Sequence, residues 1–194
     1  MKIVVATNNQ HKLGEFKKLL EELDIELLTM QDALGETLDI IEDGETFCEN
    51  SAIKALAVSA KTDKLVFSDD SGIVVDALDG APGIYSARYA GEGASDLDNL
   101  NKLIDDMKDC ENRKAQFVCV ITLAKDGEII ADFTGEVEGH LQYEADGVNG
   151  FGYDPIFVPE GFDKSFGLLS EEIKQEISHR ACATILLKEF LKEI

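Results

Sequence analysis

The sequence has few positive charges: 18 lysines and arginines stand against 39 aspartates and glutamates in 194 residues, giving a formal net charge of −21. Such a surface repels nucleic acids and anionic lipids, so a nucleic-acid polymer or a membrane is disfavoured as a partner. A small anionic ligand is compatible with this charge if the few cations converge on one site. The positions of the basic residues are therefore the informative feature.

Several other signals are absent. The sequence has no apolar run of about 18 residues, and its N-terminal apolar stretch is too short for a secretory signal, so we expect neither a transmembrane helix nor export. The four cysteines form no C-x-x-C pair, which favours free thiols in a reducing cytoplasm over disulfides or zinc ligands. Without repeats or linkers, we expect a single domain over residues 1–194, in one or two lobes.

Hydrophobic spacing predicts a mixed α/β fold in which strands and helices alternate before a hairpin follows. The expected strands cover residues 2–6, 25–28, 65–68, 73–75, 115–123 and 128–133. The expected helices cover residues 11–23, 48–59 and 96–107 and a C-terminal segment that Ser178 opens. Lys125-Asp126-Gly127 supplies the hairpin turn, and Asp69-Asp70-Ser71-Gly72 is expected to be a turn that ends its strand. The pattern indicates one long sheet with helices outside it.

The junction between the first strand and the first helix has the chemistry of an anion site. Backbone N–H groups at a helix start favour anions, and a lysine there adds a mobile cation. An ordinary helix cap with a surface lysine is the alternative, and the G-x-x-x-x-G-K-[ST] motif of the Walker P-loop is absent. The candidate residues are Thr7, Asn8, Asn9, Gln10, His11 and Lys12.

Two acidic segments together resemble a split magnesium site. Neighbouring side chains of an extended chain point in opposite directions, so Asp69 and Asp70 do not form one bidentate pair, and one of them can face a metal or water. Upstream, Glu42 belongs to a second acidic turn around Gly44. Carboxylate oxygens suit Mg²⁺, which keeps most of its waters and shares substrate phosphates. Solvated turns in an acidic chain are the alternative.

Further cations stand near these turns and near a loop that mixes glycines with aromatics. Lys54 shares a helix face with Asn50, from which it either reaches Asp70 or stays a surface cation. Residues 150–155 can bring backbone and an aromatic ring close to a base, or they form a tight loop with buried rings. Three basic residues stand close together in the sequence: Lys174, His179 and Arg180. They could bind a phosphate or a purine carbonyl, or they form a solvated helix start.

Five segments match one family in the same order: ATNNQHK (6–12), EDGETFCENSAIKA (42–55), SDDSGIVVDALDGAPGIYSARYAG (68–91), GFGYDPIF (150–157) and ISHR (177–180). They extend over nearly the whole chain, and the sequence thereby resembles the inosine triphosphate pyrophosphatase family. The resemblance implies hydrolysis of the non-standard purine nucleotides ITP, dITP and XTP to the monophosphate and pyrophosphate. It also implies an elongated, curved mixed sheet with two lobes around a central cleft, Mg²⁺ as the metal and, usually, a homodimer.

The resemblance also assigns roles to residues. It implies that Asp70 and Glu42 hold the metal, that Asp70 activates the attacking water and that Lys54 keeps Asp70 ionised. Ile41 stands where some family members have a glutamate, and we choose Glu42 as the second carboxylate. The phosphates are assigned to residues 7–12 and Ser71. The base is assigned to Phe151, Lys174, His179 and Arg180, with Asp154 nearby, and Gly152 and Tyr153 are also expected to bind the substrate.

Selectivity for non-standard purines has a physical basis in this set. Hypoxanthine and xanthine present a 6-oxo acceptor where adenine presents an amine donor, so donors from Lys174, His179 or Arg180 favour the former. A non-catalytic purine nucleotide-binding module is the alternative from another class, and a magnesium phosphatase that releases orthophosphate is a second enzyme alternative. A binding module need not retain Glu42, Lys54 and Asp70. Because all three are present, the pyrophosphatase is favoured.

Overall fold

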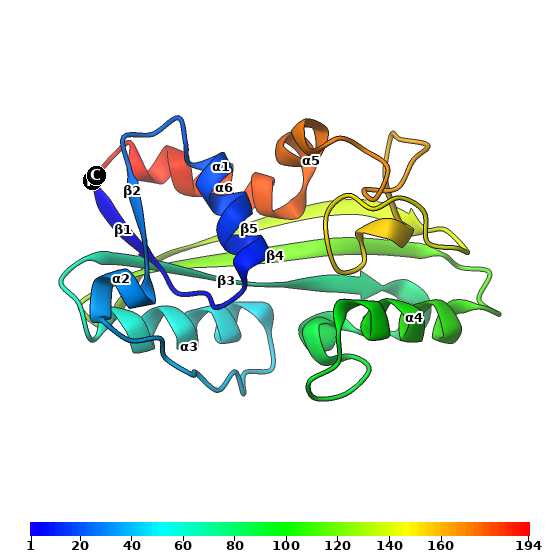
Figure 1. The fold of residues 1–194 in the computed structure, drawn as a ribbon, viewed down its shortest axis with the longest axis horizontal. Coiled ribbons are helices and arrows are strands. Elements are labelled where there is room, and N and C mark those ends of the chain that lie inside the picture. The colour runs from blue at the N-terminus through cyan, green and yellow to red at the C-terminus, as the bar shows by residue number, and fades with distance from the viewer. The chain divides into compact units, whose positions relative to one another are not determined.

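The computed structural model describes residues 1–194 and contains one six-stranded mixed sheet with helices on its faces (Figure 1). The strand order is β2-β1-β3-β4-β5-β6, with β1 (Lys2–Val5) parallel to both β2 (Glu26–Thr29) and β3 (Leu65–Val75). The sheet is completed by β4 (Lys114–Lys125), β5 (Glu128–Leu141) and β6 (Phe157–Pro159). Because β5 and β6 are antiparallel, the sheet is mixed, and the predicted α/β class is confirmed.

The chain divides into two compact units. The first unit comprises Met1–Asp70, Cys119–Gly135 and Arg180–Ile194, and the second comprises Ser71–Val118 and Glu136–His179. Strands β3, β4 and β5 each contribute residues to both units. The expected single domain over residues 1–194 stays a prediction.

In the first unit, alternate side chains of the strands face two different cores. The helices of this unit are α1 (Gln10–Leu19), α2 (Met30–Leu34), α3 (Phe47–Ser59) and α6 (His179–Leu191). Ile3, Val5 and Phe67 pack with residues of α1 and α6 on one face. Val4 and Val66 pack with residues of α2 and α3 on the other face. This alternation, which follows from the two-residue period of a strand, decides which helix each β3 side chain meets.

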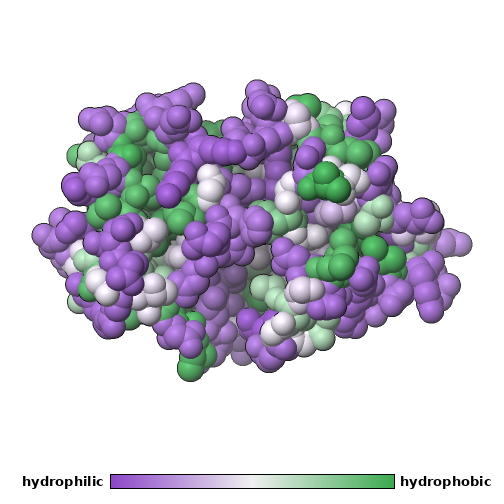
Figure 2. Space-filling view, in the orientation of Figure 1, coloured by the Kyte–Doolittle hydropathy of each residue, from purple (hydrophilic) through white to green (hydrophobic).

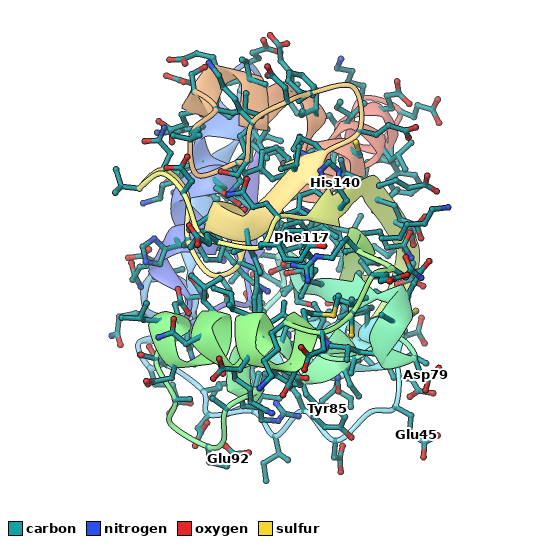
Figure 3. All side chains as sticks on the ribbon, turned by 90° about the vertical axis from the view of Figure 1, so that its right-hand side faces the viewer. Glu45, Asp79, Tyr85, Glu92, Phe117 and His140 are labelled. Carbon is teal, nitrogen blue, oxygen red and sulfur yellow. The ribbon has the colours of Figure 1, made fainter.

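A third core fills the second unit. Its helical elements are α4 (Asp96–Met107), α5 (Glu171–Ile177) and the 3-10 helices η1 (Asp76–Leu78), η2 (Gly83–Arg88) and η3 (Asp154–Ile156). Leu103 and Met107 of α4 belong to the same buried cluster as Ile73 and Phe117 of the strands. Figure 3 shows Phe117 amid the interior side chains and Tyr85 near the surface. The strongly amphipathic spacing of α4 explains why its predicted and observed bounds agree.

Strand β3 runs without interruption through Asp69-Asp70-Ser71-Gly72, so the turn predicted there is wrong. Both aspartates are buried instead of solvated, because cations from other elements lie beside them. Gly72 serves a close approach: a Cβ atom there would lie 2.4 Å from the carbonyl oxygen of Gly83 and from Oγ of Ser86. The glycine that suggested a turn therefore lets η2 pack directly on the strand.

The remaining elements lie near their predicted positions. The hairpin between β4 and β5 turns at Asp126 and Gly127, whose φ angles of 53° and 79° are those that a two-residue turn of this kind requires. Helix α1 ends at Leu19 rather than at residue 23, and both hairpin strands extend further than predicted. Helices α2 and α5 were not predicted, since each is too short to establish a helical period.

Hydrophilic residues cover most of the face drawn in Figure 2, as expected for a chain with 39 acidic residues. None of the helices combines the length and the apolar character needed to cross a bilayer. None of the four cysteines forms a disulfide in the structure.

Candidate active site

A buried group of charges lies in the first unit, where residues of α1, β3 and α6 meet. Oδ2 of Asp69 lies 2.9 Å from Nζ of Lys12 and 3.2 Å from Nη2 of Arg180. Nη1 of Arg180 also pairs with Oε2 of Glu15. Asp69 and Arg180 are each only 1% exposed. We call Lys12, Glu15, Asp69 and Arg180 the charge cluster.

Mutual compensation keeps the charge cluster ionised. Burial by itself raises the pKa of Asp69, but the surrounding cations, above all Lys12 and Arg180, hold that pKa well below its ordinary 3.8. Burial likewise lowers the pKa of Arg180, and the carboxylates of Asp69 and Glu15 raise it by more. Oδ1 of Asp69 is buried and has no hydrogen-bond partner in the protein. The cluster therefore supplies fixed charges near neutral pH.

Asp70 follows on β3 and points to the opposite side of the strand, the side of α3. Burial raises the pKa of Asp70 above its ordinary 3.8; nearby Lys54 opposes this shift and nearby Glu42 adds to it. Nζ of Lys54 donates a hydrogen bond to Oε2 of Glu42. Asp70 is 8% exposed, and Ser71, the next residue, is partly buried. The structure thus brings together the three residues expected at the metal and water site.

Helix α3 holds the acidic segment against its first turn. The N–H of Gly44 donates to Oδ1 of Asn50 at 2.8 Å. A Cβ atom at Gly44 would lie 2.7 Å from Cβ of Glu49, so the segment approaches the helix as closely as it does because residue 44 is glycine. The loop that carries Glu42 is thereby fixed. Asn50 is a supporting residue whose role the sequence did not reveal, although its spacing placed it on the same helix face as Lys54.

The segment predicted to bind phosphate forms the cap of α1. Oδ1 of Asn9 accepts hydrogen bonds from the N–H groups of His11 and Lys12 at 2.9 and 3.2 Å. The N–H of Asn9 in turn donates to Oγ1 of Thr7 at 3.2 Å. The exposed members of the segment are Asn8, Asn9, Gln10 and His11. Three of the amides expected at the phosphates are therefore used within the cap, and Lys12 is the member that joins the charge cluster.

A second set of polar groups lies in the second unit, on the glycine and aromatic loop and on α5. Nζ of Lys174 lies 2.7 Å from Oδ2 of Asp154 and 4.8 Å from the centre of the Phe151 ring. The same oxygen of Asp154 accepts the N–H of Phe151 at 2.8 Å. A Cβ atom at Gly150 would lie 2.0 Å from this oxygen, so only glycine leaves room for it. We call Phe151, Asp154 and Lys174 the loop cluster.

Two loop residues expected to bind the substrate, Gly152 and Tyr153, make contacts within the protein. The hydroxyl of Tyr153 donates to the carbonyl oxygen of Ser86 at 2.7 Å, and Tyr153 is only 5% exposed. The N–H of Gly152 donates to Oδ2 of Asp96 at 3.2 Å. The hydroxyl of Tyr153 thus fastens the loop to η2, and the expected contact of Tyr153 with the substrate stays a prediction.

His179 and Arg180 are neighbours in sequence but belong to different units. The ring of His179 stacks on Phe117, with centroids 4.7 Å apart and an interplanar angle of 11°. Arg180 is held by Asp69 and Glu15 and so belongs to the charge cluster, and its assignment to the base stays a prediction. Sequence analysis missed Phe117, because an aromatic residue inside an apolar strand gives no signal beyond core packing.

The Ham1 family model matches residues 3–190. The chain belongs to the Ham1 family. It is 43% identical to a dITP/XTP pyrophosphatase of Oceanobacillus iheyensis over 100% of this chain and 99% of that protein. It is also 44% identical to a dITP/XTP pyrophosphatase of Staphylococcus epidermidis over 98% of this chain and 96% of that protein.

Solved structures of Ham1 proteins share the fold. The Ham1 protein of Staphylococcus aureus matches with a TM-score of 0.89 at 42% identity, over 100% of this chain and 99% of that one. A HAM1 protein of Coxiella burnetii matches with a TM-score of 0.90 at 37% identity, over the full length of both chains. The family resemblance inferred from five sequence segments is thereby confirmed.

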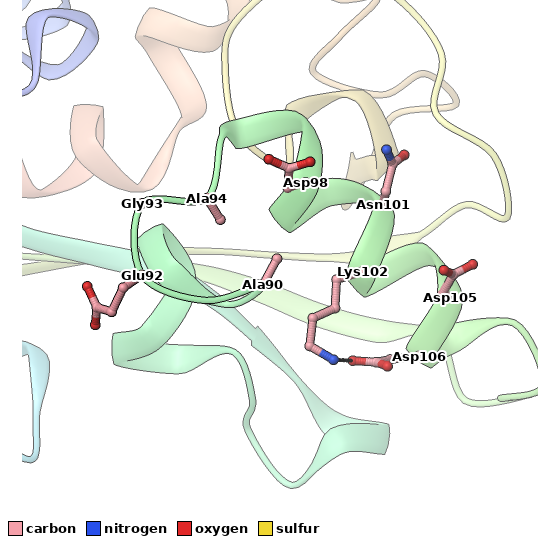
Figure 4. Close-up of a pocket in the computed structure, with 9 residues that line it drawn as sticks. All are labelled: Ala90, Glu92, Gly93, Ala94, Asp98, Asn101, Lys102, Asp105 and Asp106. Atoms are coloured by element: carbon pink, nitrogen blue, oxygen red, sulfur yellow. Dashed lines mark hydrogen bonds and ion pairs between the residues drawn. The ribbon is translucent and has the colours of Figure 1, made fainter.

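The second unit of this Ham1 chain also contains an acidic pocket of about 590 Å³ beside α4 (Figure 4). Lys102, the one cation in its wall, donates to Asp106 at 2.9 Å and lies over the ring of Tyr89. The pocket is lined by Ala90, Glu92, Gly93, Ala94, Asp98, Asn101, Lys102, Asp105 and Asp106. No predicted site residue lines this pocket.

The donor set for a metal in this Ham1 chain is small. No group of three or more histidine, cysteine, aspartate or glutamate side chains is placed to hold an ion. Glu42 and Asp70 lie close enough for the charge of Glu42 to raise the pKa of Asp70. Two carboxylates fit Mg²⁺, because this ion keeps several waters and completes its shell with substrate phosphates.

Proposed function

We propose that this chain is a hydrolase that cleaves dITP, ITP and XTP to the monophosphate and pyrophosphate. The observation that carries the proposal is the convergence of scarce cations: Lys12, Lys54 and Arg180 all act on Asp69 in a chain of net charge −21. A polyanion is the ligand class that such a concentration of positive charge attracts. The dITP/XTP pyrophosphatases that are 43–44% identical over nearly the whole chain support the same substrate class.

Asp70 is the residue that we assign to the attacking water. Burial raises its pKa, and a carboxylate of higher pKa is a better proton acceptor. In the reaction, water attacks the α-phosphorus, Asp70 takes the proton and pyrophosphate departs with the electron pair of the broken P–O bond.

We assign Mg²⁺ to Asp70 and Glu42. When bound, the ion supplies positive charge to the triphosphate and to the leaving pyrophosphate. The charges of the residues themselves favour such an ion. Three cations, Lys12, Lys54 and Arg180, stand against four carboxylates, Glu15, Glu42, Asp69 and Asp70. A divalent cation is therefore needed to make this part of the first unit net positive.

The phosphates are assigned to Lys12, to the cap of α1 over residues 7–12 and to Ser71. Nζ of Lys12 carries three donors, so it can keep its contact with Asp69 and still donate to a phosphate oxygen. Arg180 is too deeply buried for the same task. Its part is to hold Asp69 ionised, which in turn fixes Lys12.

The base is assigned to the loop cluster and His179. The ring of Phe151 offers a surface on which a purine can stack, which is worth about 1–3 kcal/mol in nucleic-acid systems. Nζ of Lys174 donates to Asp154 beside this ring, and an ammonium group is a donor that a 6-oxo group can accept. Adenine would meet this donor with its own amine, so ATP is disfavoured. Guanine shares the 6-oxo group, and this donor set does not distinguish it.

The proposal is tested with a substrate panel and product identification. The purified chain with Mg²⁺ is expected to release pyrophosphate from dITP, ITP and XTP far faster than from ATP. Orthophosphate as the first product would indicate the phosphatase instead, and tight binding of ITP without turnover would indicate a binding module. Equal rates on all nucleotides would contradict the assigned selectivity. A preparation treated with a chelator serves as the control, and the return of activity with Mg²⁺ or Mn²⁺ identifies the metal.

A homodimer, which the family resemblance implies, and a cytoplasmic location, which the unpaired cysteines favour, complete the proposal. Analytical ultracentrifugation tests the homodimer, and fractionation of the source cells tests the location. A monomer at assay concentrations would contradict the first of these expectations.

A further inference from the structure

Helix α3 is joined to the sheet by a serine hydroxyl. Oγ of Ser51 donates a hydrogen bond to the carbonyl oxygen of Ser68 on β3 at 3.2 Å, and it accepts one from the N–H of Thr122 on β4 at 3.1 Å. Strands β3 and β4 are neighbours in the sheet, and α3 runs along one face of it (Figure 1). A helix side chain therefore bridges the main chains of two adjacent strands.

A second hydrogen bond runs in the opposite direction. Oγ of Ser68 donates to the carbonyl oxygen of Ser51 at 2.5 Å, and the two hydroxyl oxygens lie 3.1 Å apart. Ser51, Ser68 and Thr122 have no exposed surface. A buried polar group that loses its partner is costly, so these bonds oppose any sliding of α3 along the strands.

We call the hydrogen bonds among Ser51, Ser68 and Thr122 the joint. On β3, the joint lies close to Asp70, a residue of the proposed reaction. Asp70 follows Ser68 by two residues, so both side chains project from the same face of β3. On the helix side, Lys54 follows Ser51 by three residues, which places the two on neighbouring turns of one helix face. The hydroxyl of Ser51 therefore connects the helix face that carries Lys54 to the middle part of β3, where Asp70 lies.

Helix α3 also holds the acidic loop that contains Glu42 and Gly44. Asn50 holds the N–H of Gly44, and Lys54 bonds to Glu42 in that loop. The loop thus moves with α3. A shift of α3 relative to β3 would displace both charged neighbours of Asp70 together.

We propose that Ser51 is a positioning residue: its hydroxyl fixes Lys54 on α3, and through it Glu42, against Asp70 on β3. This inference rests on the function proposed above. Ser51 acts through Lys54 and takes no part in the chemical step itself.

Ser59 provides a matched comparison on the same helix. It is also buried, but its hydroxyl donates to the carbonyl oxygen of Leu56, within α3. Ser59→Ala removes a buried hydroxyl from α3 and leaves the joint to β3 and β4 in place. Any effect that is specific to Ser51→Ala therefore reports on the joint.

The first experiment measures kcat and KM for ITP with Ser51→Ala and Ser59→Ala, at a temperature well below the lower of their two unfolding midpoints. Since a displacement of about 1 Å at a reacting group can cost ~100-fold in rate, we expect Ser51→Ala to lose about tenfold or more in kcat. KM is expected to change by less than about twofold, and Ser59→Ala to resemble the wild type. Ser51→Cys, which keeps a weak S–H donor, is expected between alanine and serine and replaces the alanine variant if that one does not fold.

The second experiment combines Ser51→Ala with Lys54→Met in a double-mutant cycle. If Ser51 acts through Lys54, the loss of its hydroxyl costs less than about twofold in kcat once Lys54 is gone. Full additivity of the two substitutions would overturn the proposal, and so would equal kcat values for Ser51→Ala and Ser59→Ala. An inactive wild-type protein would instead overturn the proposed function, and the wild-type assay detects this before any variant is compared.

Discussion

The charge cluster of the first unit and the loop cluster of the second each contain some of the chain's few cations, but they pair these cations in different ways. In the first, Asp69 is shared by two cations, and one of these, Arg180, is shared in turn by a second carboxylate. In the second, a single ion pair between Lys174 and Asp154 lies against an aromatic ring. Shared charges suit a ligand with several negative oxygens, whereas one donor above a ring suits a flat base with one acceptor.

The two clusters also differ in how the chain assembles them. Arg180 reaches Asp69 across 111 residues and Glu15 across 165 residues, so the charge cluster forms only when the first unit folds. The loop cluster joins Phe151 to Asp154 across three residues, and Lys174 is only 20 residues further on. Substitutions in the first cluster are therefore expected to affect stability, and substitutions in the second to affect recognition.

The largest effect is expected for Asp69→Asn. Removing one partner from a buried set of ion pairs leaves charges uncompensated, which costs about 3–5 kcal/mol in the free energy of unfolding. Asp154→Asn is the matched comparison, and we expect a smaller loss because the pair of Asp154 with Lys174 joins near neighbours in sequence, whereas Asp69 holds both Lys12 and Arg180 from distant elements. Urea unfolding of both variants measures the difference. Equal losses would mean that pairing with distant elements does not decide the cost.

The same variant predicts a pH dependence. Because the pKa of Asp69 is lower in the folded protein, its ionised form stabilises the fold above the unfolded pKa of about 3.9, and this contribution is lost as the pH falls below that value. The gap in stability between wild type and Asp69→Asn is therefore expected to be constant from about pH 5 to 7 and to narrow below about pH 4. A gap that persists in acid would contradict this assignment. Chelator-treated protein is used throughout.

In contrast to Asp69→Asn, the Asp70→Asn variant is expected to lose activity but not stability. As the proposed proton acceptor, Asp70 is expected to contribute at least ~100-fold to kcat. Since burial raises its pKa, the fold disfavours its charge, and the neutral variant should be as stable as the wild type or more so. Steady-state kinetics and thermal unfolding measure the two quantities. Near-full activity would mean that another group accepts the proton of the attacking water. A large loss of stability would mean that the charge of Asp70 stabilises the fold, as the charge of Asp69 does.

The smallest effect is expected for Lys174→Met in the loop cluster. The ratio of kcat/KM for ITP to that for ATP should fall about tenfold, mainly through KM, because one donor to the 6-oxo group is lost. Lys102→Met is the control: Lys102 lies 4.7 Å from the ring centre of Tyr89 and 2.9 Å from Asp106, a similar geometry outside the cluster. If both variants alter the ratio equally, the loop cluster does not select the base.

The sequence predicted those features that depend on neighbours along the chain. The hairpin at Asp126 and Gly127 and the bounds of α4 were predicted because turn chemistry and hydrophobic period are local. The polar residues around Asp70 were misinterpreted as a turn because a sequence pattern reports only on neighbours along the chain. It does not show that cations from α1, α3 and α6 lie beside these residues. Arg180 was assigned to the base because its carboxylate partners lie far away in sequence.

Contacts made by hydroxyl groups were the hardest to foresee. Tyr153 stands in a loop whose composition suggests a ligand, yet its hydroxyl is bound to Ser86. Ser51 and Ser68 look like ordinary small residues of a helix and a strand, and only their three-dimensional pairing shows a joint. The sequence does not distinguish a serine whose hydroxyl bonds within its own helix, as that of Ser59 does, from one whose hydroxyl bonds to another element.

Three strands pass from one unit into the other, which restricts how this protein can be taken apart. A cut after Asp70 would divide β3 in its middle, and cuts after Val118 and Gly135 would do the same to β4 and β5. Neither half keeps β3, β4 or β5 intact, so neither is expected to fold when it is expressed or transplanted as an independent module. Fragments or chimaeras of this chain should therefore be joined at the β4–β5 hairpin or in the long loops, where no strand is interrupted.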